Sequence, residues 1–240
     1  MKKLFLMLGC LVLITACQSA PVESSTPATV TPTPSALPAT ATATVIPSTP
    51  VPYFFTEEFN GDLGAWVSFQ TGGAEAPAVS LENDTLRIDF PSTNTWYYAI
   101  HNAHEYSNVF VNAKFSGTPT GSLGVICDYS ESKGWYEFNL ASDGTYNILF
   151  GQWLAEGIAQ YTPITNKPTE YLKPEKLDYE IGLTCQDNIL LLHINGKLFH
   201  KLDVTRYGLT KGMIGITASS FDEVPMTATF DWIKVSEPSQ

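Results

Sequence analysis

The sequence has few basic residues, with 13 Lys and Arg against 24 Asp and Glu, and its formal net charge is -11. A surface with such an excess of negative charge repels the phosphate backbone of nucleic acids. The composition therefore disfavours a nucleic-acid partner and leaves neutral partners open.

Long apolar runs are also missing, apart from a short one at the start of the chain. Lys2 and Lys3 precede LFLMLGCLVLITA, which is too short for a membrane-spanning helix but fits the apolar region of a secretory signal. The run ends at Cys17 within LITACQSA, which resembles the lipobox of bacterial lipoproteins. The resemblance implies a signal peptide at residues 1–16 and lipidation of Cys17. The alternative is an ordinary secretory signal in which the cysteine is coincidental.

The next segment lacks large apolar side chains. From Ala20 to Pro52 it consists mainly of Pro, Thr, Ser, Ala and Val, and Glu23 is its only charged residue. Such a composition is typical of an extended, partly polyproline II spacer. We therefore expect residues 17–52 to be a lipidated cysteine followed by a disordered linker. The protein would be exported and attached to a membrane through lipid only, at the cell surface or the outer membrane.

Helical periodicity is absent as well, because no apolar repeat of the helical kind continues for more than about two turns. Alternation of apolar and polar residues replaces it from Tyr53 onwards, as in Val109 to Phe115, where every second side chain is apolar. Turn signals such as Asn195-Gly196 separate these runs. The pattern predicts an all-β sandwich of two antiparallel sheets over residues 53–236, with a tail at 237–240.

Several short motifs of this region resemble, in their order, the concanavalin A-like jelly rolls of the laminin-G-like and DUF1080 (3-keto-disaccharide hydrolase-like) type. The motifs are EEFNGDLGAW, GVICDY, GWYEFNLASDGTYNI, LLLHINGKLF, GMIGI and TFDWIKV. The resemblance implies a concave outer face of the kind often used for carbohydrate. It does not choose between lectins, hydrolases and adhesion modules, because one fold hosts many functions.

Cysteine is scarce, and removal of the signal with Cys10 and lipidation of Cys17 would leave only Cys127 and Cys185. Both lie in alternating apolar stretches, and export would place them in an oxidising compartment. We therefore predict a disulfide between them. Two buried free thiols are the alternative.

Signatures of catalysis and of zinc are not found. Retaining glycosidases of this fold carry closely spaced acidic residues on one strand, and no stretch here matches that pattern. Asp128 and Glu137 are the alternative acid/base pair, provided that they lie opposite each other on paired strands. By resemblance, Glu57, Glu58 and Asp231 are candidates for a structural calcium ion. No other cofactor is expected.

Aromatic residues are plentiful, with 5 Trp and 11 Tyr. In GWYEFNL, Trp135, Glu137 and Asn139 alternate with Tyr136 and Phe138, and we expect the first three side chains to face outwards. Aromatic rings beside amides and acids suit the faces and hydroxyl groups of sugars. The alternative is that such rings cap the ends of the sandwich. The residues predicted to bind ligand are Trp96, Tyr98, Asp128, Trp135, Glu137, Asn139 and Trp153.

The same pattern assigns directions to the preceding strand and to a later segment. Asp128 is expected to face outwards, and Cys127 and Tyr129 inwards. Trp153 and Tyr161 fall in GQWLAEGIAQYTP, which we interpret as a long connection. The sequence thus predicts a lipid-anchored jelly roll that binds carbohydrate without catalysis. The alternatives are a glycoside hydrolase that uses Asp128 with Glu137 and a protein-binding adhesion or scaffold domain.

Overall fold

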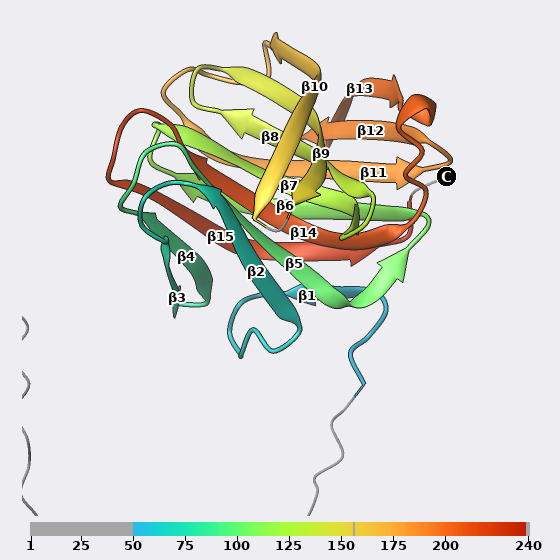
Figure 1. Ribbon diagram of the computed structural model, residues 1–240, viewed down its shortest axis with the longest axis horizontal. Helices are drawn as coiled ribbons and strands as arrows, with labels where there is room; N and C mark the ends of the chain where they lie inside the picture. Colours follow the sequence, from blue (N-terminus) through green and yellow to red (C-terminus); the bar gives the residue numbers. More distant parts are fainter. Residues whose placement is uncertain (1–49, 156, 239–240) are drawn as a thin grey trace, which may run out of the picture. The chain divides into compact units, whose positions relative to one another are not determined.

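The computed structural model describes residues 50–155 and 157–238, which form two layers of antiparallel β-sheet (Figure 1). The predicted signal peptide, Cys17 and almost all of the predicted linker lie outside the described residues. The prediction of an all-β sandwich is confirmed, since the single helical element among the described residues is a 3-10 turn, η1 (Thr205–Tyr207). No helix in this part of the chain is long and apolar enough to cross a membrane.

The first layer is an eight-stranded sheet. All of its strands except β1 (Phe55–Glu57) follow one another in a continuous order, the main path, and β1 pairs with β15 outside this order. The order of the main path is β13 (Lys197–Asp203), β12 (Ile189–Ile194), β11 (Leu177–Gln186), β6 (Val109–Gly117), β15 (Met226–Ser236), β4 (Thr85–Phe90) and β3 (Ala78–Glu82).

The second layer is a seven-stranded sheet whose edge strands are β10 and β2. Its order is β10 (Ile158–Pro168), β9 (Thr145–Ala155), β8 (Gly134–Ala141), β7 (Gly121–Ser130), β14 (Gly212–Ser220), β5 (Thr95–Tyr106) and β2 (Trp66–Gly72).

The strands form where the sequence alternates. In β6 the side chains of Val109, Val111, Ala113 and Phe115 are fully buried, and those between them are half-buried. The β12–β13 hairpin turns at Asn195 and Gly196, which have φ angles of 49° and 74°. Positive φ at both central positions is what the type I′ turn requires, so the expected hairpin is confirmed.

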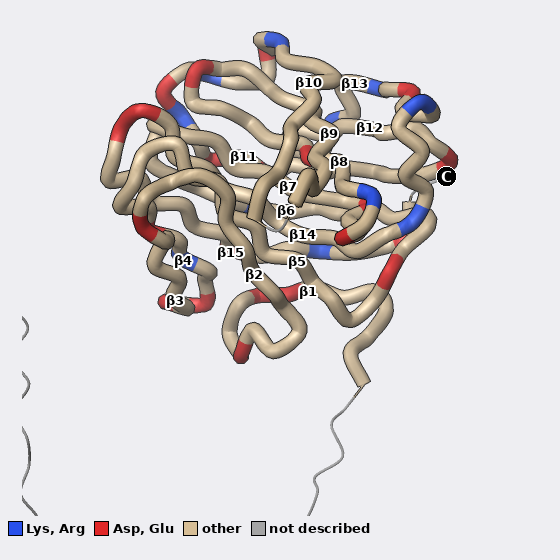
Figure 2. The backbone as a smooth tube through the Cα atoms, in the orientation of Figure 1, with Lys and Arg blue, Asp and Glu red and all other residues tan. Residues whose placement is uncertain are grey.

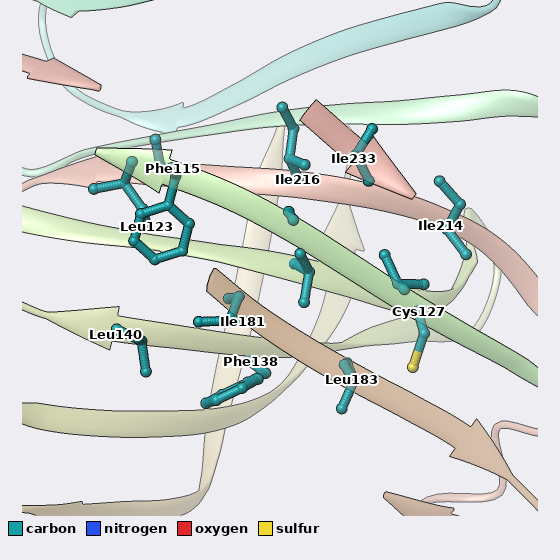
Figure 3. Packing of buried hydrophobic residues seen from close by; sticks show 14 of the residues in the cluster. Phe115, Leu123, Cys127, Phe138, Leu140, Ile181, Leu183, Ile214, Ile216 and Ile233 are labelled. Carbon is teal, nitrogen blue, oxygen red and sulfur yellow. The ribbon is translucent and has the colours of Figure 1, made fainter. Parts of the chain in front are cut away.

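The main core lies between the two sheets, and a disulfide crosses it. Figure 3 shows Cys127 of β7 among Leu183 and Ile214, within a cluster of aliphatic and aromatic side chains. Cys127 is bonded to Cys185 of β11, as predicted, so one covalent link joins the two sheets. A loop of 58 residues closed in this way stabilises the fold by about 4 kcal/mol on the chain-entropy model.

An irregularity in β7 changes the direction of two side chains that the sequence pattern assigned. The register between β7 and β8 shifts between Cys127 and Ser130, and Asp128 has a φ of 52°. Such a β-bulge moves the following residue to the other face of the sheet. Tyr129 therefore packs on the outer face, beside Trp135, and the prediction that it faces inwards is wrong.

The segment interpreted as a long connection is a hairpin of two long strands, β9 and β10. The two strands pair along their whole length, with register shifts near Ile158 and Pro163. Proline is tolerated there because β10 is an edge strand. Figure 1 shows β10 crossing the outer side of the seven-stranded sheet and approaching the end of β2, so this sheet curls until its two edges come close.

Charged residues lie mostly on loops and near the ends of strands (Figure 2). The outer face of the seven-stranded sheet is instead covered by aromatic and amide side chains.

Candidate functional site

A second aromatic cluster covers the outer face of the seven-stranded sheet. Its buried members are Tyr98, Ile100, Ile126, Tyr129 and Trp135. Phe69 of β2, Trp96 of β5, and Trp153 and Tyr161 of the β9–β10 hairpin pack against them. The face that the sequence pattern leaves open to ligands is therefore largely filled by the protein's own side chains.

Trp135 lies at the centre of this cluster and is 0% exposed. Its indole lies over Gly151 of β9, where an added Cβ would come within 2.3 Å of Trp135 Cε2. The rings of Trp153 and Tyr161 cover it at centroid distances of 5.4 and 6.0 Å. The prediction that Trp135 points to the outer face of β8 is thus correct, but the expectation that it is open to a ligand is wrong.

Glu137 follows Trp135 on the same face of β8 and is also buried. Its Oε1 accepts a hydrogen bond from Asn139 Nδ2 at 2.7 Å, and its Oε2 lies 3.3 Å from the hydroxyl of Tyr98. Burial raises the pKa of Glu137 to about 7, and the neighbouring donors only partly offset this effect. The side chain is a buried carboxyl that changes its charge near neutral pH.

Tyr161 joins the two edges of the sheet above this carboxyl. Its hydroxyl accepts a hydrogen bond from Tyr98 at 2.9 Å and lies 2.7 Å from Thr71 Oγ1 of β2. Burial raises the pKa of Tyr161 to about 12, so the phenol stays protonated at neutral pH. We call Thr71, Tyr98 and Tyr161 the tyrosine bridge.

On one side of the tyrosine bridge the outer face holds a groove of about 570 Å³, the aromatic groove. Trp153 Nε1 donates to the hydroxyl of Tyr129 at 3.3 Å, and the ring of Phe69 lies 4.9 Å from that of Trp153. Polar side chains lie along the same groove. Its lining residues are Val67, Ser68, Phe69, Gln70, Asn102, Tyr129, Glu131, Trp153, Ala155, Gly157 and Met213.

A smaller hollow of about 210 Å³ lies elsewhere on the same face and shares no lining residue with the groove. It contains three asparagines of neighbouring strands, Asn139, Asn147 and Asn166, next to Trp96. We call it the asparagine pocket. Its other lining residues are Ser122, Ala141, Asp143, Thr145, Leu149 and Phe221.

Asp128 does not join Glu137. The residue opposite Glu137 on β7 is Ile126, whereas Asp128 lies in the bulge beyond it. The Asp128 side chain is buried, its Oδ1 has no hydrogen-bond partner among the described residues, and burial raises its pKa to about 7. Burial, together with the negative charge of Asp128, raises the pKa of Tyr136, which belongs to the core between the sheets. The prediction that Asp128 faces outwards opposite Glu137 is therefore wrong.

The calcium candidates do not converge on one point. Among residues 50–155 and 157–238, no three His, Cys, Asp or Glu side chains form a group that could hold a metal ion. Glu57 Oε1 instead accepts a hydrogen bond from the backbone N–H of Phe59 at 2.9 Å. The three acids thus have no shared ligand geometry.

The structure divides the seven predicted ligand-binding residues into four groups. Trp96 and Asn139 line the asparagine pocket, Trp153 lines the aromatic groove, Tyr98, Trp135 and Glu137 lie buried at the tyrosine bridge, and Asp128 lies apart. The sequence pattern missed Phe69, Tyr129, Asn147 and Asn166. A signal for Asn147 exists, because a hairpin that turns at Asp143 pairs positions 139 and 147.

Comparisons with known proteins find similarity at the level of the fold. The sequence matches no protein-family model and no curated protein sequence. A galectin-like-fold protein from Bacillus subtilis is 13% identical over 76% of this chain and 94% of its own, with a TM-score of 0.56. A glycoside hydrolase family 16 endo-glucanase from Bacteroides ovatus is 11% identical over 76% and 99%, with a TM-score of 0.55.

The potassium-bound Emp46p carbohydrate recognition domain is 13% identical over 78% of this chain and 98% of its own, with a TM-score of 0.52. At these identities the likeness shows the fold alone. The domain is therefore a jelly roll of the concanavalin A-like kind, an architecture that it shares with a glycoside hydrolase and a carbohydrate recognition domain.

Proposed function

We propose that the domain binds carbohydrate in the aromatic groove and does not cleave it. The observation that carries this proposal is the pairing of half-buried rings, Phe69 and Trp153, with the polar side chains of Gln70, Asn102 and Glu131 in one groove. Sugar rings stack on flat aromatic surfaces while their hydroxyl groups bond to polar groups beside them. The groove offers both kinds of contact.

The ring of Trp153 is held in place before any ligand arrives. Its indole N–H donates to Tyr129, and Phe69 and Trp135 pack against it at 4.9 and 5.4 Å. A side chain that is already ordered loses little conformational entropy on binding. This preorganisation supports a role of Trp153 as the stacking surface of the groove.

Cleavage has less support. Glycoside hydrolysis needs two carboxyl groups that flank one bond. Glu137 is 1% exposed and lines neither hollow, and Asp128 lies in the bulge on a different part of β7. Neither carboxyl therefore reaches a ligand in the groove.

A glycan array tests the proposal when retention and release of reducing ends are recorded together. We expect retention of at least one glycan without product, and a loss of about ten-fold in affinity in Trp153→Ala, since aromatic anchors dominate such sites. Trp232→Ala, a half-buried tryptophan on β15 of the other sheet, is the matched control and should bind normally. Product release, or equal binding by both variants, would reject the proposal. Capture of a protein instead of a glycan would favour the adhesion alternative.

We also propose that the chain is a lipoprotein attached to a membrane through Cys17. The support is the position of Cys17 directly after a short apolar run and before a proline-rich segment. The chain with Cys17→Ser should move from the membrane fraction to the soluble fraction, and mass spectrometry of the N-terminal peptide should then lack the acyl chains. A mutant that stays in the membrane fraction would reject the anchor.

A further inference from the structure

The asparagine pocket contains a row of three carboxamides on neighbouring strands. Asn139 of β8 is opposite Asn147 of β9, which is opposite Asn166 of β10. Asn166 Nδ2 donates to Asn147 Oδ1, and Asn147 Nδ2 donates to Asn139 Oδ1 at 2.9 Å. Asn139 Nδ2 in turn donates to Glu137 Oε1. The row therefore begins at the exposed Asn166 and ends on a buried carboxyl.

The carboxylate fixes the direction of every amide in this row. An ionised carboxylate only accepts hydrogen bonds, so Asn139 must present its NH₂ group to Glu137 and its oxygen to Asn147. Asn147 must then donate to Asn139 and accept from Asn166. The oxygen of Asn166, which is exposed, is left without a partner in the row.

Each amide also keeps bonding capacity that the row does not use. A carboxamide has two N–H donors and an oxygen with two lone pairs, and a row of this kind uses only part of them. Trp96 lies beside the amides as a half-buried flat ring, and the carboxylate of Asp143 accepts from the N–H and hydroxyl of Thr145 at 2.8 and 2.6 Å. The pocket is thus rich in neutral hydrogen-bonding groups and disfavours anions.

We propose that the asparagine pocket is a second binding site, for a small neutral ligand rich in hydroxyl groups such as a single sugar residue, and that the charge of Glu137 tunes its affinity through the asparagine row. This site is separate from the aromatic groove, and the proposal stands whether or not the groove binds carbohydrate.

Ionisation of Glu137 should strengthen the binding of ligand to the asparagine pocket. A hydrogen bond to an ionised group is stronger than one to a neutral group, and bonds in a chain polarise one another. An ionised Glu137 therefore makes the oxygens of the row better acceptors for ligand hydroxyl groups. Binding should be tighter above the pKa of Glu137 and weaker below it, and bound ligand should in turn favour the ionised form.

In the part of the chain that the structure describes, few other groups that titrate face Glu137. Tyr98 of β5 and Tyr161 of β10 lie next to it, and burial raises the pKa of both phenols, so they stay neutral in the relevant range. Trp135 of β8 and Thr217 of β14, its other neighbours, do not titrate. Burial raises the pKa of Glu137 itself to about 7, which places its change of charge between pH 6 and 8, roughly one unit on either side.

The test measures binding of a panel of methyl glycopyranosides to the full chain by calorimetry at pH 5.5 and pH 8.5, values chosen roughly 1.5 units to either side of that pKa. We expect at least one glycoside to bind about two- to five-fold more tightly at the higher pH. Asn147→Ala and Asn166→Ala should weaken binding about ten-fold, whereas the exposed Asn108→Ala should not. Glu137→Gln, which keeps the shape of the side chain, should remove the dependence on pH.

Three results would overturn the proposal. The first is that no glycoside of the panel binds at either pH. The second is that binding is unchanged in the two asparagine variants, or is lost only in Trp153→Ala, which would place the ligand in the aromatic groove. The third is that Glu137→Gln keeps the full dependence on pH. Circular dichroism of each variant checks that the fold is intact, and Asn166→Ala, at an exposed position, guards against misfolding.

Discussion

The hydroxyl of Tyr161 lies 2.7 Å from that of Thr71, although β10 and β2, which carry them, are the two opposite edges of the seven-stranded sheet. The contact shows how far this sheet curls. It also explains why the outer face is divided into the aromatic groove and the asparagine pocket instead of forming one open surface.

Removal of this hydroxyl should loosen the curl. In Tyr161→Phe the ring stays, but Thr71 and Tyr98 each lose a partner in a buried site, so the free energy of unfolding should fall by about 1–2 kcal/mol. Urea denaturation measures the change. Tyr171→Phe, at a position that is 37% exposed, is the control. If both variants have the same stability, the bridge does not hold the edges together.

Gly151 is needed because the indole of Trp135 occupies the space of a side chain. In Gly151→Ala the new Cβ would lie 2.3 Å from Trp135 Cε2, so Trp135 must move, at a cost of about 1–3 kcal/mol in the free energy of unfolding. The near-ultraviolet circular dichroism of the tryptophans should change at the same time. Gly61→Ala, where no atom lies within 4 Å, should alter neither quantity. An unchanged spectrum of Gly151→Ala would show that the indole does not pack there.

The disulfide between the sheets should account for a large part of the stability. Replacing both Cys127 and Cys185 by Ala should lower the free energy of unfolding by about 4 kcal/mol, because the unfolded chain regains the freedom of the closed loop. The midpoint of urea denaturation reports the loss. A reducing agent should lower the midpoint of the unchanged chain and leave that of the double variant as it is. A midpoint that does not respond to reduction would contradict the link.

The buried carboxyls should make part of the stability decrease as pH rises. Burial raises the pKa of Glu137 from 4.5 to about 7 and that of Asp128 from 3.8 to about 7. The folded state then holds more protons than the unfolded state between about pH 4 and 7, so the contribution of each group to the free energy of unfolding falls through this window. Above it, Glu137→Gln and Asp128→Asn should gain stability relative to the unchanged chain.

His101 acts in the opposite direction, which is why the variants must be compared with the unchanged chain at each pH. Burial lowers the pKa of His101 from 6.5 to about 4, so its contribution to the free energy of unfolding rises with pH between these values. His101→Phe should therefore steepen the fall caused by the two carboxyls. Profiles with the same slope for all four proteins would mean that none of these groups is held in its neutral form.

Much of the fold can be predicted from local features of the sequence. Alternation identifies β6 and β11, Asn195-Gly196 marks a hairpin, and the two cysteines in alternating strands pair as expected. These signals depend on residues that are near one another in the chain or on a simple count. These local patterns predict the folded structure correctly because one face of each strand is buried against the opposite sheet.

The site could not be predicted in the same way. A single residue with positive φ, Asp128, reverses the direction of Tyr129, and the alternation contains no sign of it. Whether Trp135 is open or covered depends on how far the sheet curls, which results from the accumulated twist of all seven strands. Asn166 lies opposite Asn147 because the register shifts near Ile158 and Pro163 cancel, and a count of residues from the turn finds this pair only once the segment is recognised as a hairpin.

The prolines of β10 have a further consequence, for contacts between molecules. Pro163 and Pro168 lack a backbone N–H, and the exposed Lys167 lies between them on the free edge of the seven-stranded sheet. An edge with missing donors and a charged side chain is a poor template for a strand of another molecule. Crowded copies of the domain would thus meet at β10 without joining into a continuous intermolecular sheet.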